Sequence, residues 1–131
     1  MDYVEIVQSS IDYIEENILA DISTQELANK AGFSMYHYCR LFQSSVGMPV
    51  NQYMVRRKLL HALHEIKAGQ SMTDAALAYG FDTYAGFYKA CKREFGFPPR
   101  ELLKRINENI PVLHGKLGRG MERNLTRVKK K

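Results

Sequence analysis

The chain has 131 residues, a net charge of +5, 45% hydrophobic residues and 25% charged residues. This composition is ordinary for a soluble globular protein and argues against a wholly disordered chain. Its apolar runs are too short to span a membrane, and the acidic N-terminus lacks the features of a signal peptide. Two cysteines without a CxxC spacing or a dense disulfide pattern indicate a reducing, cytosolic setting.

Charge is distributed unevenly along the chain. Residues 1–32 contain seven acids and one base, whereas residues 33–105 contain eleven bases and five acids. Residues 116–131 add seven bases against one acid. A basic region on a small domain favours a polyanionic partner, although a merely solvated basic surface is an alternative that charge alone does not exclude.

Periodicity and capping residues predict helices throughout the chain. Ser23 and Glu26 have the spacing of a capping box, in which both side chains bond to backbone amides at a helix start, and Ser71 and Asp74 resemble it. No segment alternates convincingly at period two, so we expect an all-α fold without a sheet. Glycine or proline ends most of the helices. The predicted helices cover about residues 4–18, 24–31, 35–46, 50–68, 73–79, 84–95 and 98–106.

The longest predicted helix, at about residues 50–68, separates two halves of one domain over residues 1–106. We expect a first helix-turn-helix at about 24–46 and a second at about 72–95. After Asn107 the chain becomes rich in glycine and cations, so residues 107–131 are expected to form a flexible basic tail or linker.

The two halves repeat one pattern. AGFSMYHYCRLFQSSVGMP, from Ala31, and YGFDTYAGFYKACKREFGFP, from Tyr79, align at an offset of 48 residues and then 49. Each copy is a short capped helix, a turn containing glycine and a second helix, which is a helix-turn-helix unit. A connecting helix over 50–68 would be about 28 Å long. That length would hold two recognition helices near the roughly 34 Å spacing of successive major grooves.

At this point the chain resembles the AraC/XylS family of bacterial transcription regulators over about residues 5–105. ELANKAGFSMYHYCRLFQSSVGMPVNQYMVRRKL and MTDAALAYGFDTYAGFYKACKREFGFPP carry the resemblance. It implies seven helices in two subdomains, sequence-specific binding of double-stranded DNA and, most often, activation through RNA polymerase. Departures from the family pattern are Cys91 in place of phenylalanine, the stretch Tyr84-Ala85-Gly86 at the second recognition helix, and Leu103-Lys104.

Carried over position by position, the resemblance places parts of two helices against DNA. Arg40 is the strongest candidate, because a guanidinium can bond both O6 and N7 of guanine; a phosphate contact or a salt bridge is the alternative. Phe42 is instead expected in the core. Ala85 and Gly86 lack hydrogen-bonding side chains, so methyl contacts and close backbone approach are expected there. The predicted DNA-facing residues are Met35, Tyr36, Cys39 and Arg40 in the first helix, and Thr83, Tyr84, Ala85, Tyr88 and Lys89 in the second.

Three further cations are weaker candidates for phosphate contacts, namely Arg57, Lys92 and Arg93. Arg57 either contacts phosphate or ties the two subdomains together through hydrogen bonds. Solvated charge is the alternative for Lys92 and Arg93.

Catalytic and metal-binding patterns are not evident. His61 and His64 share a helix face but lack a third ligand, so no metal site is expected. Cys39 and His37 are two residues apart on a helix and point apart, so they do not form a nucleophile–base pair. We expect neither an enzyme nor a cofactor.

The favoured function is transcription regulation through two recognition helices in adjacent major grooves, with double-stranded DNA and RNA polymerase as partners. We expect a monomeric DNA-binding domain in the cytoplasm, associated with the nucleoid and not with a membrane. The alternative is a helical protein-interaction module with weak nonspecific DNA binding, favoured by the weak polarity of residues 84–86. The chain is either a stand-alone regulator or the DNA-binding part of a longer one, and the linker-like composition after Asn107 favours the second.

Overall fold

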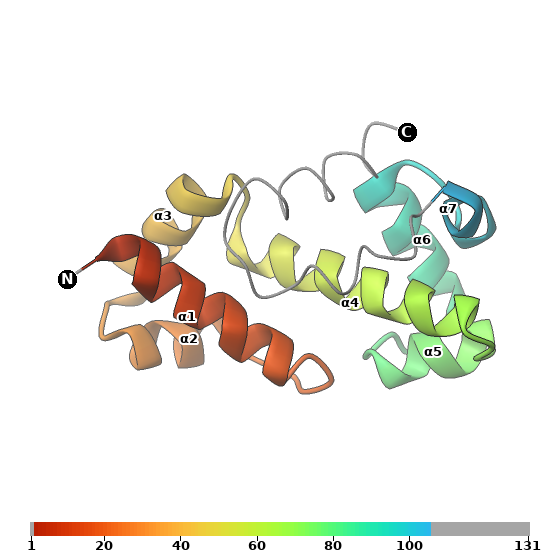
Figure 1. Cartoon of the computed structure of the whole chain (residues 1–131), viewed down its shortest axis with the longest axis horizontal. Helices are drawn as coiled ribbons and strands as arrows, with labels where there is room; N and C mark the ends of the chain where they lie inside the picture. The colour runs from red at the N-terminus through yellow and green to blue at the C-terminus, as the bar shows by residue number, and fades with distance from the viewer. Residues whose placement is uncertain (1, 106–131) are drawn as a thin grey trace.

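The computed structural model describes residues 2–105, which form seven α-helices and no strand (Figure 1). The all-α prediction is therefore confirmed for this part of the chain. The predicted tail, residues 107–131, lies outside the described residues. The helices are α1 (Tyr3–Glu16), α2 (Thr24–Ala31), α3 (Met35–Val46), α4 (Val50–Lys67), α5 (Met72–Ala78), α6 (Tyr84–Phe95) and α7 (Pro99–Arg105).

The predicted starts of the helices agree with the structure to within about a residue, and side-chain caps explain this agreement for α2, α3, α5 and α6. The Ser23 hydroxyl accepts a hydrogen bond from the backbone N–H of Glu26 at 3.0 Å. Ser71 caps α5 in the same way, at 3.0 Å from the N–H of Asp74. Gly32, at φ 79°, ends α2 in the left-handed conformation that glycine adopts without strain.

The first helix ends earlier than its apolar stripe suggests. The stripe continues to Ile18, but α1 stops at Glu16, where the backbone N–H of Asn17 bonds to the carbonyls of Tyr13 and Ile14. The Asn17 side chain also donates to the Tyr13 carbonyl at 2.9 Å, which closes the last turn. Ile18 still contributes to the core from the following loop.

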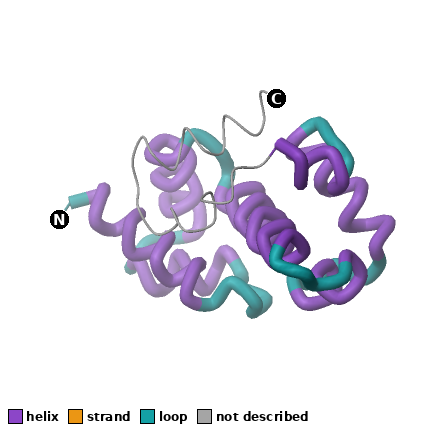
Figure 2. The backbone as a smooth tube through the Cα atoms, turned by 45° about the vertical axis from the view of Figure 1, so that its right-hand side comes forward, coloured by secondary structure: helices purple, strands orange, loops and turns teal. Residues whose placement is uncertain are grey.

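The helices form two groups around α4. Helices α1, α2 and α3 pack together near the start of α4, and α5, α6 and α7 pack along the rest of it (Figure 1). The rotated view shows α4 between these two groups (Figure 2). In each group a helix-turn-helix pair, α2–α3 or α5–α6, leaves its second helix on the same side of α4, in the upper half of Figure 1.

One hydrophobic cluster runs through both groups. Phe42 of α3 and Tyr53 of α4 are fully buried, and their ring centroids lie 5.5 Å apart. Cys91 of α6 is also fully buried, so the small side chain that replaces phenylalanine still packs in the core. Burial raises the pKa of the Cys91 thiol to about 12. None of the helices in residues 2–105 has the length and apolar composition needed to cross a membrane.

Candidate nucleic-acid interface

Helix α3, the first predicted recognition helix, is held in place by its buried side. Its N-cap residue, Ser34, accepts a hydrogen bond from the N–H of His37 at 3.2 Å. Tyr38, Phe42 and Val46 are buried against the rest of the domain. With this face in the core, the opposite face presents the predicted DNA-facing residues to solvent. Met35, Tyr36 and Arg40 are exposed, and Cys39 is half-buried beside them.

Arg40 is held by its neighbour one turn earlier. One terminal nitrogen of the guanidinium, Nη1, donates to the Tyr36 hydroxyl at 2.7 Å. The guanidinium carbon lies 5.5 Å from the centroid of the Tyr36 ring, within the range of a cation–π contact. A guanidinium has five N–H donors, so this bond leaves others for a base or a phosphate. The pair therefore restricts the Arg40 side chain without using up its hydrogen-bonding capacity.

The exposed face of α3 also contains a shallow hollow of mainly apolar lining. The residues around it are Met35, Tyr36, Cys39, Arg40 and Gln43. These positions follow the spacing of one helix face, so the hollow is a property of α3 alone. It contains no acidic residue, which suits a surface that approaches a polyanion.

Helix α6, the second predicted recognition helix, is anchored in the same way but has a different exposed face. Phe87, Ala90, Cys91 and Phe95 are buried, whereas Ala85, Gly86, Tyr88 and Lys89 are exposed. Tyr84 is half-buried, with its ring centroid 6.2 Å from those of Phe87 and Tyr88. Unlike α3, this face includes two adjacent residues, Ala85 and Gly86, that have no hydrogen-bonding side chain.

Thr83 has a structural role in addition to its predicted position at the DNA. It is the N-cap of α6, and its hydroxyl accepts a hydrogen bond from the N–H of Gly86 at 3.0 Å. The side chain is exposed, so its hydroxyl hydrogen remains available to a phosphate or a base edge.

The candidate phosphate contacts fall into two groups. Lys92 and Arg93 are exposed on α6, and Arg93 also bonds to its neighbour Glu94 at 3.0 Å. Arg57 is different: it is only 1% exposed, and its Nε donates to Glu15 at 2.5 Å. A phosphate contact by Arg57 does not fit this burial. The alternative role fits, since the bond joins α4 to α1.

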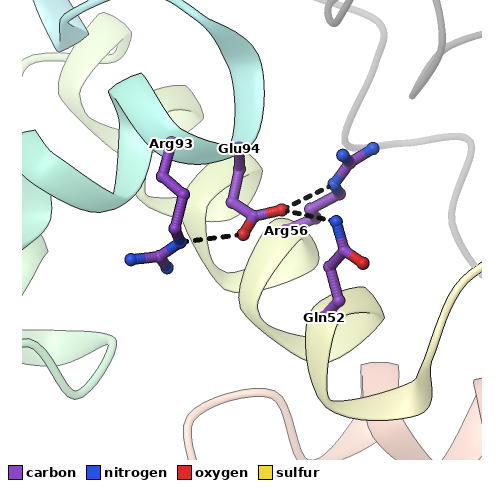
Figure 3. Close-up of polar contacts among 4 residues, drawn as sticks. All are labelled: Gln52, Arg56, Arg93 and Glu94. Atoms are coloured by element: carbon purple, nitrogen blue, oxygen red, sulfur yellow. Dashed lines mark hydrogen bonds and ion pairs between the residues drawn. The ribbon is translucent and has the colours of Figure 1, made fainter.

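A second buried ion pair was not anticipated from the sequence. Arg56 of α4 donates through Nε to Glu94 of α6 at 3.0 Å, and Gln52 donates to the same carboxylate oxygen at 3.0 Å (Figure 3). Burial raises the pKa of Glu94, but the hydrogen bonds from Arg56, Gln52 and Arg93 outweigh it and leave the pKa below its ordinary value. The sequence feature that could have indicated this ion pair is the presence of two adjacent arginines, Arg56 and Arg57, on the buried side of α4.

Glu15 has a matching environment at the other end of the domain. Burial raises the pKa of Glu15, but the hydrogen bond with His61 and the charge of Arg57 together lower it by more, so the net shift of the pKa is downward. The His61 Nε2 atom lies 2.7 Å from the Glu15 carboxylate. Within residues 2–105, no group of three or more histidine, cysteine or acidic side chains is placed to hold a metal ion.

Comparison with known proteins agrees with this architecture. A family model described as a helix-turn-helix domain matches residues 27–105. The uncharacterised HTH-type transcriptional regulator YbfP of Bacillus subtilis is 33% identical over 110 residues, which cover 81% of this chain but only 37% of that protein. The HTH-type transcriptional activator AarP of Providencia stuartii is 32% identical over 95 residues, covering 72% of this chain and 70% of that protein.

A third relative is the multiple antibiotic resistance protein MarA of Escherichia coli, which is 26% identical over 96 residues. These residues cover 72% of this chain and 76% of that protein. The match to the family model begins within α2 and covers the rest of the first helix-turn-helix pair, the connecting helix α4 and the second pair. The chain belongs to the AraC/XylS family of helix-turn-helix transcription regulators.

Proposed function

We propose that the chain binds double-stranded DNA sequence-specifically by inserting α3 and α6 into adjacent major grooves on one face of the duplex. The observation that carries this proposal is the common position of α3 and α6 on one side of α4 (Figure 1). The 18 residues of α4 make a helix about 27 Å long, close to the roughly 34 Å between successive major grooves. One chain then supplies both reading helices, which dimeric regulators supply from two subunits.

The exposed residues of the two helices support different tasks. Arg40 is suited to bidentate recognition of guanine, because its guanidinium is exposed and oriented by Tyr36. On α6, Lys89 and Lys92 supply positive charge, while Ala85 and Gly86 allow the helix backbone to approach the duplex closely. We therefore assign the more specific base readout to α3, and close backbone approach with weaker base readout to α6.

Regulation in the cytoplasm, through contact with RNA polymerase at promoters, is the biological role that we propose. The support is the name of one relative, AarP, which is described as a transcriptional activator. The DNA-binding domain is proposed to act as a monomer, because it contains both helix-turn-helix pairs within one hydrophobic cluster.

Selection of bound duplexes from a randomised pool tests the proposal directly. With the 131-residue chain at near-physiological salt, we expect two short sequence boxes about one helical turn apart. A single box would restrict base readout to one helix and contradict the two-helix arrangement. The absence of any enriched sequence, with affinity falling steeply as salt rises, would contradict sequence-specific binding altogether.

A protein-interaction module with weak DNA affinity is the second candidate function. The exposed Ala85 and Gly86 favour it, since neither has a side chain that can form a hydrogen bond. Such a module would bind all duplexes with similar, weak affinity, and Arg40→Ala would lower that affinity equally for all of them. The proposed regulator loses affinity only for duplexes with one particular base pair.

A further inference from the structure

The mainly apolar hollow on the exposed face of α3 is not explained by the packing of the domain. Met35 is 45% exposed and Tyr36 is 65% exposed, although both are large apolar side chains. Together with Cys39 they line the hollow, and Arg40 and Gln43 complete its wall. The buried side of α3 already supplies the contacts that hold the helix in place. The exposed apolar side chains are therefore free to contact a partner.

The position of Arg40 in the wall identifies the kind of partner. If α3 enters the major groove as proposed above, every group around the hollow faces base edges. The C5-methyl group of thymine is the apolar group that the four bases present in that groove, and guanine presents the two acceptors that suit arginine. An apolar surface next to a guanidinium thus matches a thymine close to a guanine.

We propose that Met35 and Cys39 read thymine through its methyl group, adjacent to the guanine that Arg40 contacts. This proposal rests on the function proposed above and makes it specific, because it names the base that the apolar part of α3 selects. Aligned with α3, α6 has Tyr84 and Tyr88 at the positions of Met35 and Cys39, and Lys89 at that of Arg40. These tyrosines are bulkier and have hydroxyl groups, so we assign methyl readout to α3, and thus to the first box, and not to α6.

Deoxyuridine provides the test, because it differs from thymidine only by the methyl group. Each thymidine of the selected duplex is replaced singly by deoxyuridine, and the dissociation constant is measured with the full chain. At one or two positions of the first box we expect affinity to fall about fourfold, the effect of burying one methyl group. Substitutions in the second box are the internal comparison and are expected to change affinity by less than twofold.

Two variants link the effect to the hollow. Met35→Ala removes the thioether side chain from the lining of the hollow, and Cys39→Ser replaces the thiol by a hydroxyl of similar size. Both residues lie on the exposed face of α3, so the fold should be preserved, as circular dichroism and thermal unfolding will show. We expect each variant to bind the thymidine and deoxyuridine duplexes with nearly equal affinity.

Leu77→Ala is the matched control, because Leu77 is a 52% exposed apolar residue on α5, away from the hollow. It should keep the full fourfold preference for thymidine. If all single deoxyuridine substitutions in a selected first box are neutral, or if both variants retain the preference, methyl readout by the hollow is overturned while the proposed function stands. If no box is selected at all, the proposed function fails and this proposal fails with it.

Discussion

Arg56 and Arg57 are neighbours on α4, yet each is buried against a carboxylate from a different half of the protein. Arg57 bonds to Glu15 of α1, and Arg56 bonds to Glu94 of α6. Successive residues on a helix point about 100° apart, so two adjacent side chains can reach helices on different sides of α4. The central helix is therefore linked to both halves by buried, charge-assisted hydrogen bonds.

Replacing Glu94 by glutamine is expected to destabilise the protein. Glu94 is 8% exposed and Arg56 is 4% exposed, so the variant leaves a buried guanidinium without its countercharge. Breaking one side of a buried pair costs about 3–5 kcal/mol in free energy of unfolding, and the glutamine oxygen retains part of the interaction. We expect a loss of about 3 kcal/mol in urea unfolding.

The exposed ion pair of α7 is the control for this experiment. Glu101 and Arg105 lie 3.1 Å apart, with side chains that are 40% and 36% exposed. Because water screens such a pair, Glu101→Gln should change the free energy of unfolding by no more than about 0.5 kcal/mol. Equal effects of the two substitutions would show that burial of Glu94 does not matter.

The two buried carboxylates also predict how stability depends on pH. The pKa values of Glu15 and Glu94 lie below their ordinary value of 4.5 in the folded protein. Between each lowered pKa and 4.5 the unfolded chain binds more protons than the folded chain, so stability rises with pH there. The stabilisation is fully present at pH values above the ordinary pKa of 4.5, and it is lost as the pH falls through the lowered pKa values that the two groups have in the folded protein.

Urea unfolding at a series of pH values from 6 down to about 2 measures this loss. The double variant Glu15→Gln, Glu94→Gln should be less stable at pH 6 but should show a flatter decline as pH falls. An identical decline in the wild type and the double variant would mean that other groups cause acid unfolding.

The Arg40→Ala substitution is expected to weaken DNA binding at one base position. Loss of a bidentate contact with guanine costs about 1–3 kcal/mol of discrimination, measured as the ratio of affinities for the selected duplex and its single-base variants. Tyr36→Phe removes only the hydroxyl that accepts the 2.7 Å bond from Arg40, so it should cost less while preserving the same base preference. Uniform weakening on every duplex would instead assign Arg40 to phosphate contact.

Gly86→Ala is expected to change stability and DNA binding in opposite directions. The position is helical with ordinary backbone angles, and an added Cβ would meet only the Thr83 hydroxyl oxygen, at 3.4 Å, a normal contact distance. Alanine should therefore raise the free energy of unfolding by about 0.5–1 kcal/mol. If the duplex approaches this backbone closely, as proposed, affinity falls at the same time; unchanged affinity would exclude close approach at Gly86.

Gly80→Ala is the matched comparison for that result. Gly80 has φ 91°, a left-handed conformation that strains any residue with a Cβ atom. The same glycine-to-alanine change should therefore lower stability there, by about 1 kcal/mol or more.

Local signals in the sequence predicted the helices well, because four of the helix starts carry a serine or threonine cap. Ser23, Ser34, Ser71 and Thr83 all accept hydrogen bonds from backbone amides of the helices that follow them. The end of α1 was less predictable. The apolar stripe continues to Ile18, whereas the helix stops where Asn17 bonds to carbonyls of the last turn.

Local sequence patterns did not predict which charged residues pair across long distances in the sequence. Glu15 and Arg57 are 42 residues apart in sequence, and Arg56 and Glu94 are 38 apart. A glutamate on an amphipathic helix is ordinarily exposed, so nothing around Glu15 or Glu94 marks burial. The candidate site was more accessible to sequence reasoning, since the repeat aligns α3 with α6; contact of their exposed residues with DNA stays a prediction.

The α4 helix joins the two halves, so it fixes the spacing of the two boxes independently of the bases that each box contains. One inserted residue in α4 would rotate α6 by about 100° relative to α3 and move it about 1.5 Å along the axis, disrupting at least one of the buried pairs. The spacing of the two boxes is thus tied to core residues that tolerate little change. The bases within each box depend on exposed residues, which can change one at a time. Proteins of this architecture are expected to diverge in the base sequence of their target sites while keeping the spacing between the two boxes.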